Sequence, residues 1–399
     1  MQILFDGAGL SGASAVEVSP DGAHVYTVGT RGCLTGATRD PGTGTLSFLQ
    51  VLCEIEADVE GLEAAQDIVS SPDGEHIYVA AQGLTVLDRD PATGLLAWAD
   101  RLVEGQGGAT GIARPEGLVV SSDGAFLYVA DFGSDAVSVF TRDSATGELS
   151  LVQALFDGQG GVSGIAAARN VALSPDGTHL YVSAGGASGS VAVFDRDAGT
   201  GTLSFVQAIL DGEGGATGLA AARAVEVSPD GDHVYVAGQL DNAVTVFARD
   251  GGTGMLTHVQ TVVDGFGGVN LLAGPFGLQI RPDGSVLVVN TFPDNALVVF
   301  ARDVVTGMLT LVEESTGMSL GTDLNNPGPP AFDPDGDHLY TASQFEQAIV
   351  AVASAPATGA LSFVQLFADE SAHNDGLEAV SGLIVSADGR HLLQHGRRW

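Results

Sequence analysis

Three arginines recur at equivalent places in the sequence and are candidates for binding an anion. Arg114, Arg169 and Arg223 each stand just before, or at the start of, a short apolar segment, and they are three of only 15 basic residues in the chain. A guanidinium group can clamp a carboxylate or a phosphate through paired hydrogen bonds. The alternative is that these arginines balance the charge of Glu116 and of the many acidic loops.

Further polar residues break the apolar pattern at corresponding positions. Gln66 and Asn170 are therefore assigned to the same ligand site. Glu116 is the candidate for activating water, a role that requires burial to raise its pKa. The second candidate is His373, within residues 370–375, because imidazole titrates near neutral pH.

A recurring Ser-Pro-Asp-Gly motif, followed by an apolar strand that carries His and Tyr, defines the elements that position these residues. Copies are 50 to 54 residues apart, and this period, made of short alternating strands and Gly-rich turns, predicts one four-stranded blade per repeat. We expect an all-β protein in which residues 1–399 form a single β-propeller domain. The repeats are centred on Asp21, Asp73, Asp123, Asp176, Asp230, Asp283, Asp335 and Asp388.

The number of blades depends on the two ends of the chain. Residues 1–6 match the end of an internal repeat, and residues 382–395 match the first two strands of another. With seven complete repeats, these segments fall one strand short of eight blades. We expect eight blades, with the N-terminal strand closing the ring, because closure removes exposed sheet edges. A seven-bladed ring with overhanging ends is the alternative.

The recurrent histidines and tyrosines are expected to be structural. Equivalent positions in different blades lie far apart around a ring, so the histidines would not gather into a metal site, and no metal site is predicted. The loops between second and third strands and the crossings between blades share one face, where the repeats vary most. We expect the ligand site there, at the channel mouth. The recurrent residues are His24, His76, His179, His233, His338 and His391, with Tyr26, Tyr78, Tyr128, Tyr181, Tyr235 and Tyr340.

The strongly acidic composition excludes several classes of partner. All 15 basic residues are arginines, against 49 acidic residues, and the net charge is −34. Such a field repels nucleic acid and anionic membranes, and no apolar run is long enough to insert into a bilayer. We expect no cofactor. Calcium would suit the acidic, Gly-rich crossings such as residues 104–108 and 264–268, but one carboxylate per loop falls short of six to eight ligands.

The two cysteines are expected on neighbouring strands of the first repeat. Cys33 falls in the third strand and Cys53 in the fourth, on the same face of the sheet. Either they form a cross-strand disulfide or they are two buried free thiols. A disulfide would stabilise the fold by about 3 kcal/mol and would indicate an oxidising compartment. We expect a monomer that is periplasmic or secreted, although the sequence shows no signal peptide.

The repeat unit resembles a known family. Its pattern is Val-Ser-Pro-Asp-Gly-x-His-Val-Tyr-Val, then Val-x-Val-Phe-x-Arg-Asp and Thr-Gly-x-Leu-x-Phe-Val-Gln, which resembles the propeller lactonases typified by bacterial 6-phosphogluconolactonase. The resemblance covers residues 1–399. Residues 127–137 look like that family's Asp-Leu-Gly-x-Asp segment, which adds Asp131 and Asp135 to the ligand-binding candidates. The resemblance implies hydrolysis of a sugar lactone by His, Arg and Glu side chains at the channel mouth.

Two functions follow from this resemblance. The family's His-x-His is replaced here by Arg114-Pro115-Glu116, and the blades are unusually alike. The first hypothesis is therefore a scaffold that binds a ligand, or a protein or glycan partner, through the variable face without catalysis. The alternative is a carboxylic-ester hydrolase acting on an anionic sugar lactone. In that case Arg169 and Arg223 would hold the substrate, and Glu116 or His373 would act on water.

Overall fold

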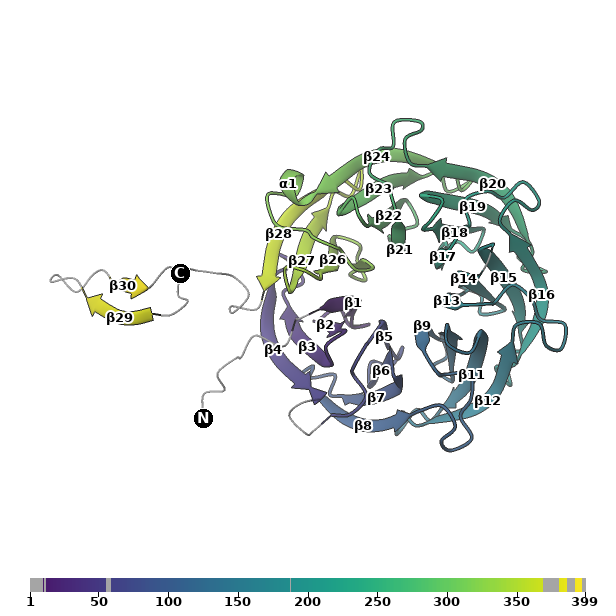
Figure 1. The fold of residues 1–399 in the computed structure, drawn as a ribbon, viewed down its shortest axis with the longest axis horizontal. Helices are drawn as coiled ribbons and strands as arrows, with labels where there is room; N and C mark the ends of the chain where they lie inside the picture. The colour runs from purple at the N-terminus through teal and green to yellow at the C-terminus, as the bar shows by residue number, and fades with distance from the viewer. Residues whose placement is uncertain are drawn as a thin grey trace.

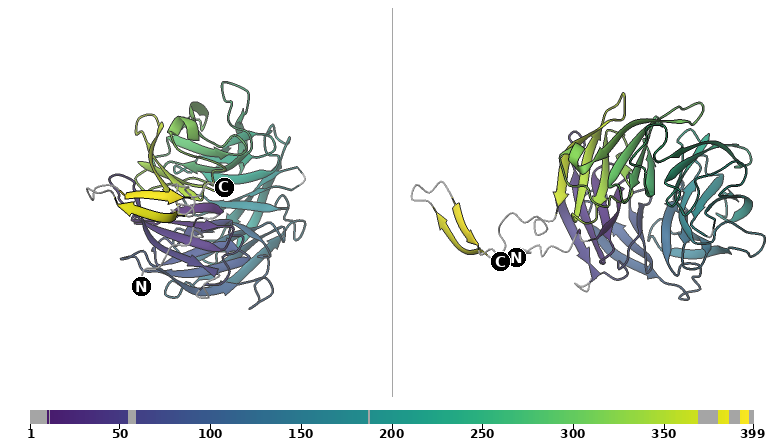
Figure 2. Two further views of the ribbon diagram at one scale, coloured as in Figure 1. Left: turned by 60° about the vertical axis from the view of Figure 1, so that its left-hand side comes forward. Right: turned by 45° about the horizontal axis from the view of Figure 1, so that its top comes forward.

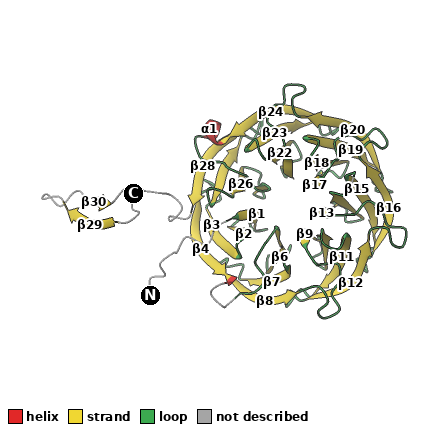
Figure 3. Ribbon diagram, viewed as in Figure 1, coloured by secondary structure: helices red, strands yellow, loops and turns green. Residues whose placement is uncertain are grey.

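Seven four-stranded antiparallel sheets surround a central channel in the computed structural model of the chain (Figure 1). The structure describes residue 10 and residues 12–54, 59–186, 188–368, 380–385 and 392–396. In every blade the strands follow one another in sequence from the channel to the rim, so the fourth strands form the outer wall (Figures 1 and 3). Figure 2 shows the same ring turned by 60° about the vertical axis and by 45° about the horizontal axis.

The first four blades use the following strands. Blade one contains β1 (Ala13–Val18), β2 (His24–Gly29), β3 (Cys33–Arg39) and β4 (Leu46–Cys53). Blade two contains β5 (Asp67–Ser70), β6 (His76–Ala81), β7 (Gly83–Arg89) and β8 (Leu96–Leu102). Blade three contains β9 (Pro115–Val120), β10 (Phe126–Asp131), β11 (Ala136–Arg142) and β12 (Leu149–Phe156). Blade four contains β13 (Ala168–Leu173), β14 (His179–Ala184), β15 (Ser190–Arg196) and β16 (Leu203–Leu210).

The remaining blades continue the pattern. Blade five contains β17 (Ala222–Val227), β18 (His233–Gly238), β19 (Ala243–Arg249) and β20 (Leu256–Val263). Blade six contains β21 (Pro275–Ile280), β22 (Val286–Thr291), β23 (Ala296–Arg302) and β24 (Leu309–Thr316), followed by the short helix α1 (Gly317–Leu320). Blade seven contains β25 (Ala331–Phe332), β26 (His338–Ser343), β27 (Ala348–Ser354) and β28 (Leu361–Ala368). No helix in the described ranges is long and apolar enough to cross a membrane.

The expectation of eight blades is wrong, because the seven complete repeats close the ring by themselves. β1 packs against β25 and β26, and β4 packs against β28. One apolar cluster spans this junction and includes Val25, Tyr340 and Ile349. In the part of the eighth motif that the structure describes, β29 (Val380–Val385) and β30 (Leu392–Gly396) pair with each other as a two-stranded sheet. Residues 1–6, expected to close the ring, and Asp388 lie outside the described residues.

Neighbouring blades are joined by a repeated cluster of Arg, Tyr, Asp and His side chains, here called the interblade belt. At the junction of blades one and two, Arg89 donates from Nε to Tyr26 Oη at 2.9 Å and from Nη2 to Asp21 Oδ2 at 2.7 Å. His24 Nδ1 lies 2.9 Å from the same Nη2. Tyr26 in turn donates to the carbonyl of Gly94 at 2.7 Å. At this junction the recurrent His and Tyr residues are therefore structural, as expected, whereas His391 lies outside the described residues.

Glycine is required at the turn that receives this tyrosine. Gly94 adopts a φ of +73°, in the left-handed region that favours glycine. A Cβ at this position would also collide with the ring of His24. The turn between the third and fourth strands of one blade therefore packs directly on the second strand of the preceding blade.

The interblade belt recurs at other junctions. The arginines that donate from Nε to a tyrosine of the preceding blade, as Arg89 does, are Arg39, Arg142, Arg196, Arg249 and Arg302.

The junction of blades six and seven departs from the belt. In blade six, Val288 occupies the position at which the other blades carry Tyr. In blade seven, Ser354 occupies the position at which the other blades carry Arg. Arg281 substitutes in part, since it binds Asp283 at 2.7 Å and the carbonyl of Pro356 at 3.1 Å. This seam therefore depends on a different set of polar contacts from the other described junctions.

The two cysteines face each other on β3 and β4 and form a disulfide. Because the bond closes a loop and restricts the unfolded chain, we expect the Cys33→Ser/Cys53→Ser variant to lose about 3 kcal/mol of unfolding free energy. Urea denaturation with and without reductant measures this loss. Reductant should lower the stability of the wild type to that of the variant and leave the variant unchanged. A variant as stable as the oxidised wild type would contradict the prediction.

Candidate functional site

Each inner strand presents two positions to the central channel. In β1, β9, β17 and β21 the second and fifth residues are partly exposed, whereas the other four are buried. Equivalent positions in the seven blades form two rings, of which the upper one lies nearer the face with the β2–β3 type loops. The upper ring is Ser14, Gln66, Glu116, Arg169, Arg223, Phe276 and Gly328, and the lower ring is Glu17, Val69, Val119, Ala172, Glu226, Gln279 and Ala331. Residues of both rings, with Ser14 and Gly328 as exceptions, line a cavity of about 430 Å³.

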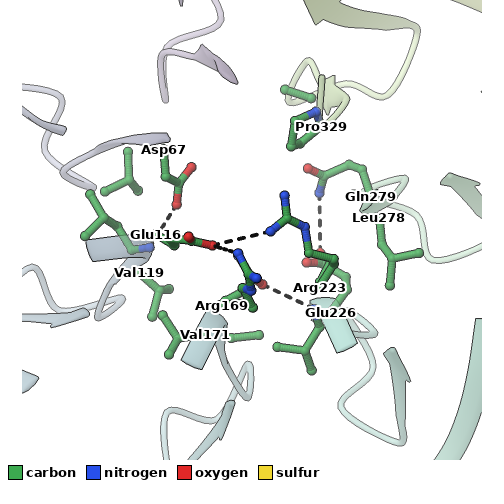
Figure 4. A pocket seen from close by; sticks show the side chains of 18 of the residues that line it. Asp67, Glu116, Val119, Arg169, Val171, Arg223, Glu226, Leu278, Gln279 and Pro329 are labelled. Atoms are coloured by element: carbon green, nitrogen blue, oxygen red, sulfur yellow. Dashed lines mark hydrogen bonds and ion pairs between the residues drawn. The ribbon is translucent and has the colours of Figure 1, made fainter. Parts of the chain in front are cut away.

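The upper ring holds an ion cluster centred on one carboxylate (Figure 4). Arg169 Nη1 donates to Glu116 Oε2 at 2.6 Å, and Arg223 Nη1 lies 3.5 Å from the same oxygen. Arg114 Nη2, from just before β9, lies 3.1 Å from Oε1. Glu116 is only 6% exposed, Arg169 and Arg223 are 19% and 17% exposed, and Arg114 is 54% exposed. Three guanidinium groups against one carboxylate leave the mouth positive, although the whole chain is strongly acidic.

Aromatic rings support the guanidinium groups from behind. Arg169 and Arg114 lie over Phe132 with Cζ 4.0 and 4.6 Å from the ring centre, and Arg223 lies 4.0 Å over Phe276. Such stacking favours a cation and fixes its plane. Burial, followed by the nearby charge of Arg169, lowers the pKa of Arg223 to about 10, so it is still a cation at neutral pH. The arginines are thus pre-positioned before any ligand enters.

Two buried polar atoms of this cluster make no hydrogen bond in the described structure. They are Arg169 Nε and Glu116 Oε1, and the contact of Oε1 with Arg114 Nη2 at 3.1 Å is an ion pair without hydrogen-bond geometry. A buried donor or acceptor that is left unpaired is costly, and in native proteins it commonly marks a site that a ligand or a bound water completes. The ion cluster therefore has unused hydrogen-bonding capacity as well as excess positive charge.

Some of the residues predicted from sequence meet at this site and others do not. Gln66 and Asn170 line the cavity, and Asn170 Oδ1 also accepts from Val225 N at 3.2 Å. Asp131 accepts from the backbone N–H of Arg114 at 2.7 Å, so it fixes the loop that carries this arginine. Asp135 accepts from Ala167 N of the next blade at 2.6 Å. His373 lies outside the described residues.

The cavity also contains two glutamates that the sequence analysis did not assign, Glu17 and Glu226, and Asp67, which the sequence marks as a further polar residue at the start of an inner strand. Burial raises the pKa of Glu226 to about 8. Burial also raises the pKa of Glu17 to about 7, against the effect of its hydrogen bond from Ser70, and that of Asp67 to about 6. The signal was present in the sequence, because both glutamates interrupt an apolar Ala-Val-Glu-Val segment. Within the described ranges, no three His, Cys, Asp or Glu residues are arranged to hold a metal ion.

Comparison with known proteins assigns the chain to a family. The model of a family described as a lactonase with a seven-bladed β-propeller matches residues 11–166 and 163–325. The chain belongs to this lactonase family. The family assignment made from the repeat motifs is thereby confirmed. None of the curated proteins searched matches the sequence.

Solved structures share the lactonase fold at low sequence identity. The periplasmic gluconolactonase of Pseudomonas aeruginosa is 22% identical, with a TM-score of 0.68 over 89% of this chain and 96% of that one. A putative 6-phosphogluconolactonase from Bacteroides uniformis is 23% identical, with a TM-score of 0.62 over 78% and 85%. Kuenenia stuttgartiensis hydrazine synthase is 19% identical, with a TM-score of 0.64 over 89% of this chain and 99% of that one. Since such different proteins share the fold, the activity must be argued from the site.

Proposed function

We propose that this lactonase-family propeller hydrolyses a sugar lactone that carries an anionic group. The observation that carries the proposal is the pair of stacked, partly buried arginines at the channel mouth, Arg169 and Arg223, held in place by Glu116. In a site shielded from bulk solvent, fixed guanidinium groups bind a phosphate or carboxylate far more strongly than they would in water. Membership of the lactonase family supplies the reaction class.

The contacts of Glu116 favour a positioning role over water activation. One of its oxygens already accepts from Arg169 at 2.6 Å, and the carboxylate lies among three guanidinium groups. Transfer of a proton to it would weaken all three ion pairs. In the proposed enzyme, Glu116 therefore orients Arg169 and Arg223 toward the anionic group of the substrate, and other groups carry the proton transfers.

Binding without catalysis is the second candidate function. The observation that favours it is the absence of a histidine among the residues that line the described cavity, since imidazole is the commonest general base near neutral pH. The same arginines would then capture an anionic sugar or an acidic protein or glycan partner. The disulfide is consistent with a secreted or periplasmic location for either function.

The test is hydrolysis of a lactone panel by the purified wild-type protein. We expect turnover of phosphorylated and carboxylated sugar lactones well above the spontaneous rate, followed by proton release at constant pH. Calorimetric titration with the hydrolysed, unreactive phosphorylated sugar acid measures binding separately. Binding of this acid without lactone turnover would favour the binding function over the lactonase function. The absence of both binding and turnover would refute both functions.

A further inference from the structure

Glu226 differs from the other carboxyls that line the cavity in its hydrogen-bond partners. Glu116 binds guanidinium groups, Glu17 accepts from Ser70 N at 3.0 Å, and Asp67 accepts from two backbone N–H groups. Glu226 alone among these cavity carboxyls has neither a backbone N–H nor a guanidinium as hydrogen-bond partner. Its partner is the neutral side-chain amide of Gln279, whose Nε2 lies 3.4 Å from Glu226 Oε1.

The position of Glu226 directs this carboxyl toward whatever the arginines bind. Glu226 and Arg223 lie three residues apart on β17, at the two positions of the strand that face the channel. Figure 4 shows Glu226 beneath Arg223, with Asp67 on the opposite side of the arginine pair. A ligand held by Arg169 and Arg223 from above would therefore meet Glu226 on one wall of the cavity and Asp67 on the other.

The protonation states of these two carboxyls differ at neutral pH. Burial, without a charged or backbone partner, holds the pKa of Glu226 near 8, so its carboxyl carries a proton. The pKa of Asp67 is raised only to about 6, so Asp67 is largely ionised. Two carboxyls with separated pKa values in one cavity form a proton donor and a proton acceptor. The other ionisable groups facing the cavity are Glu17 on β1, Glu116 on β9, Arg169 on β13 and Arg223 on β17, while β21 contributes Gln279 and β25 contributes Ala331.

We propose that Glu226 is the general acid of the lactone hydrolysis, donating its proton to the ring oxygen as the ring opens. This inference rests on the proposed function, because it assigns a residue to that same reaction. Glu226 would thus be a catalytic residue in the lower ring, separate from the arginines that bind the anionic group.

The proposed step balances without any further reactant. The oxygen of water forms a bond to the acyl carbon, the carbonyl electron pair moves onto oxygen, and one proton of the water passes to the carboxylate of Asp67. Re-formation of the carbonyl breaks the bond between the acyl carbon and the ring oxygen, and the electron pair released on that oxygen takes the proton of Glu226. Asp67 then returns its proton to Glu226 through water, and the product hydroxy acid ionises into solvent.

Glu226→Gln tests the assignment, with Glu17→Gln as its matched control. Both glutamates occupy the same ring position, and a glutamine at either place keeps the shape and can still accept a hydrogen bond. We expect Glu226→Gln to lower kcat about 100-fold or more with little change in KM, because general acid catalysis contributes roughly 10²- to 10⁴-fold. Glu17→Gln should stay within a few-fold of wild type. A general acid works only while protonated, so wild-type kcat should fall as pH rises through about 8, and Glu226→Gln should lack this fall.

The leaving group provides a second measurement that does not depend on how well the variant folds. A phenolic ring oxygen, as in dihydrocoumarin, leaves without protonation, whereas the alkoxide of an aliphatic lactone does not. Glu226→Gln should therefore slow the aliphatic lactone at least ten times more than the aryl lactone. Equal slowing of both, or equal behaviour of Glu226→Gln and Glu17→Gln, would overturn the role of Glu226 and leave the lactonase proposal standing. Absence of wild-type turnover would instead refute the proposed function itself.

Discussion

Replacing Arg169 and Arg223 with methionine is expected to reduce kcat/KM for an anionic sugar lactone about 1,000-fold. Hydrogen bonds to charged groups contribute about 1.5–3 kcal/mol each, and two of them together account for a loss of this size. Methionine keeps an unbranched apolar side chain beside Phe132 and Phe276, so the change chiefly removes the two cations and their stacking on these rings. An uncharged lactone of the same ring size should lose less than about tenfold.

The design must remove the burial cost of Glu116. Loss of both arginines would leave this buried carboxylate with Arg114 as its remaining cation, and an uncompensated buried charge destabilises a protein by itself. The variant therefore also carries Glu116→Gln, and Glu116→Gln alone is the control. The glutamine of this control still offers the two guanidinium groups a hydrogen-bond acceptor and leaves both cations in the cavity, so the control should bind the anionic lactone far more tightly than the triple variant.

Kinetics on the charged and uncharged lactones, at low and high salt, separate charge recognition from general damage. The preference of wild type for the anionic lactone should weaken as salt screens the arginines, and the triple variant should show neither the preference nor the salt effect. Equal losses on both lactones would indicate that the arginines hold the fold and do not select the substrate.

The repeat pattern was sufficient to predict the blades but not how the ring closes. A motif that recurs every 50 to 54 residues, with alternating strands, predicts four-stranded blades and gives their boundaries closely. Blade number depends on the angle between neighbouring blades, which follows from packing at each junction, such as the cluster around Tyr340 and Val25. The number of strands in the sequence does not determine this angle. The extra half-repeat therefore led to a prediction of eight blades, whereas the packing between blades closes the ring with seven.

The repeat pattern also predicted part of the candidate site. Arg114, Glu116, Arg169 and Arg223 could be grouped because the starts of the inner strands converge on the channel of a propeller. The structure places Glu116 at the position equivalent to Arg169 and Arg223, with Arg114 just before the strand, and brings a nitrogen of each arginine within 3.5 Å of a Glu116 oxygen. Glu226 was not assigned to the site, because Arg223 and Glu226 face the channel together only through the bulge in β17 between Ala222 and Ala224, which shifts the pairing with β18. Local alternation alone does not reveal such a shift.

The Arg-Asp turns illustrate a contact that local sequence cannot disclose. Arg302 looks like a turn residue, yet Nε donates to Tyr235 Oη at 2.7 Å and Nη2 lies 2.7 Å from Asp230 Oδ2, both in the preceding blade. Nη1 also donates to the carbonyl of Gly284 at 3.0 Å, and the guanidinium is fully buried. One side chain therefore ties the third strand of blade six to the second strand and first turn of blade five.

Arg302→Met is accordingly expected to lower the free energy of unfolding by about 3 kcal/mol. The methionine fills much of the space but leaves Tyr235 and a backbone carbonyl without their donor, and removal of one partner from a buried ion pair is strongly destabilising. Urea denaturation followed by fluorescence and by circular dichroism measures the loss. The two signals must coincide if a single unfolding free energy is to be assigned.

The seam between blades six and seven offers a control in the equivalent position. Ser354 occupies the place of Arg302 in the next blade, and its buried hydroxyl has no hydrogen-bond partner in the described structure. Ser354→Ala should therefore leave stability unchanged or raise it slightly, because it removes an unpaired polar group. A loss of several kcal/mol in both variants would mean that the two positions matter for packing alone. A loss confined to Arg302→Met would identify the interblade belt as a main source of ring stability.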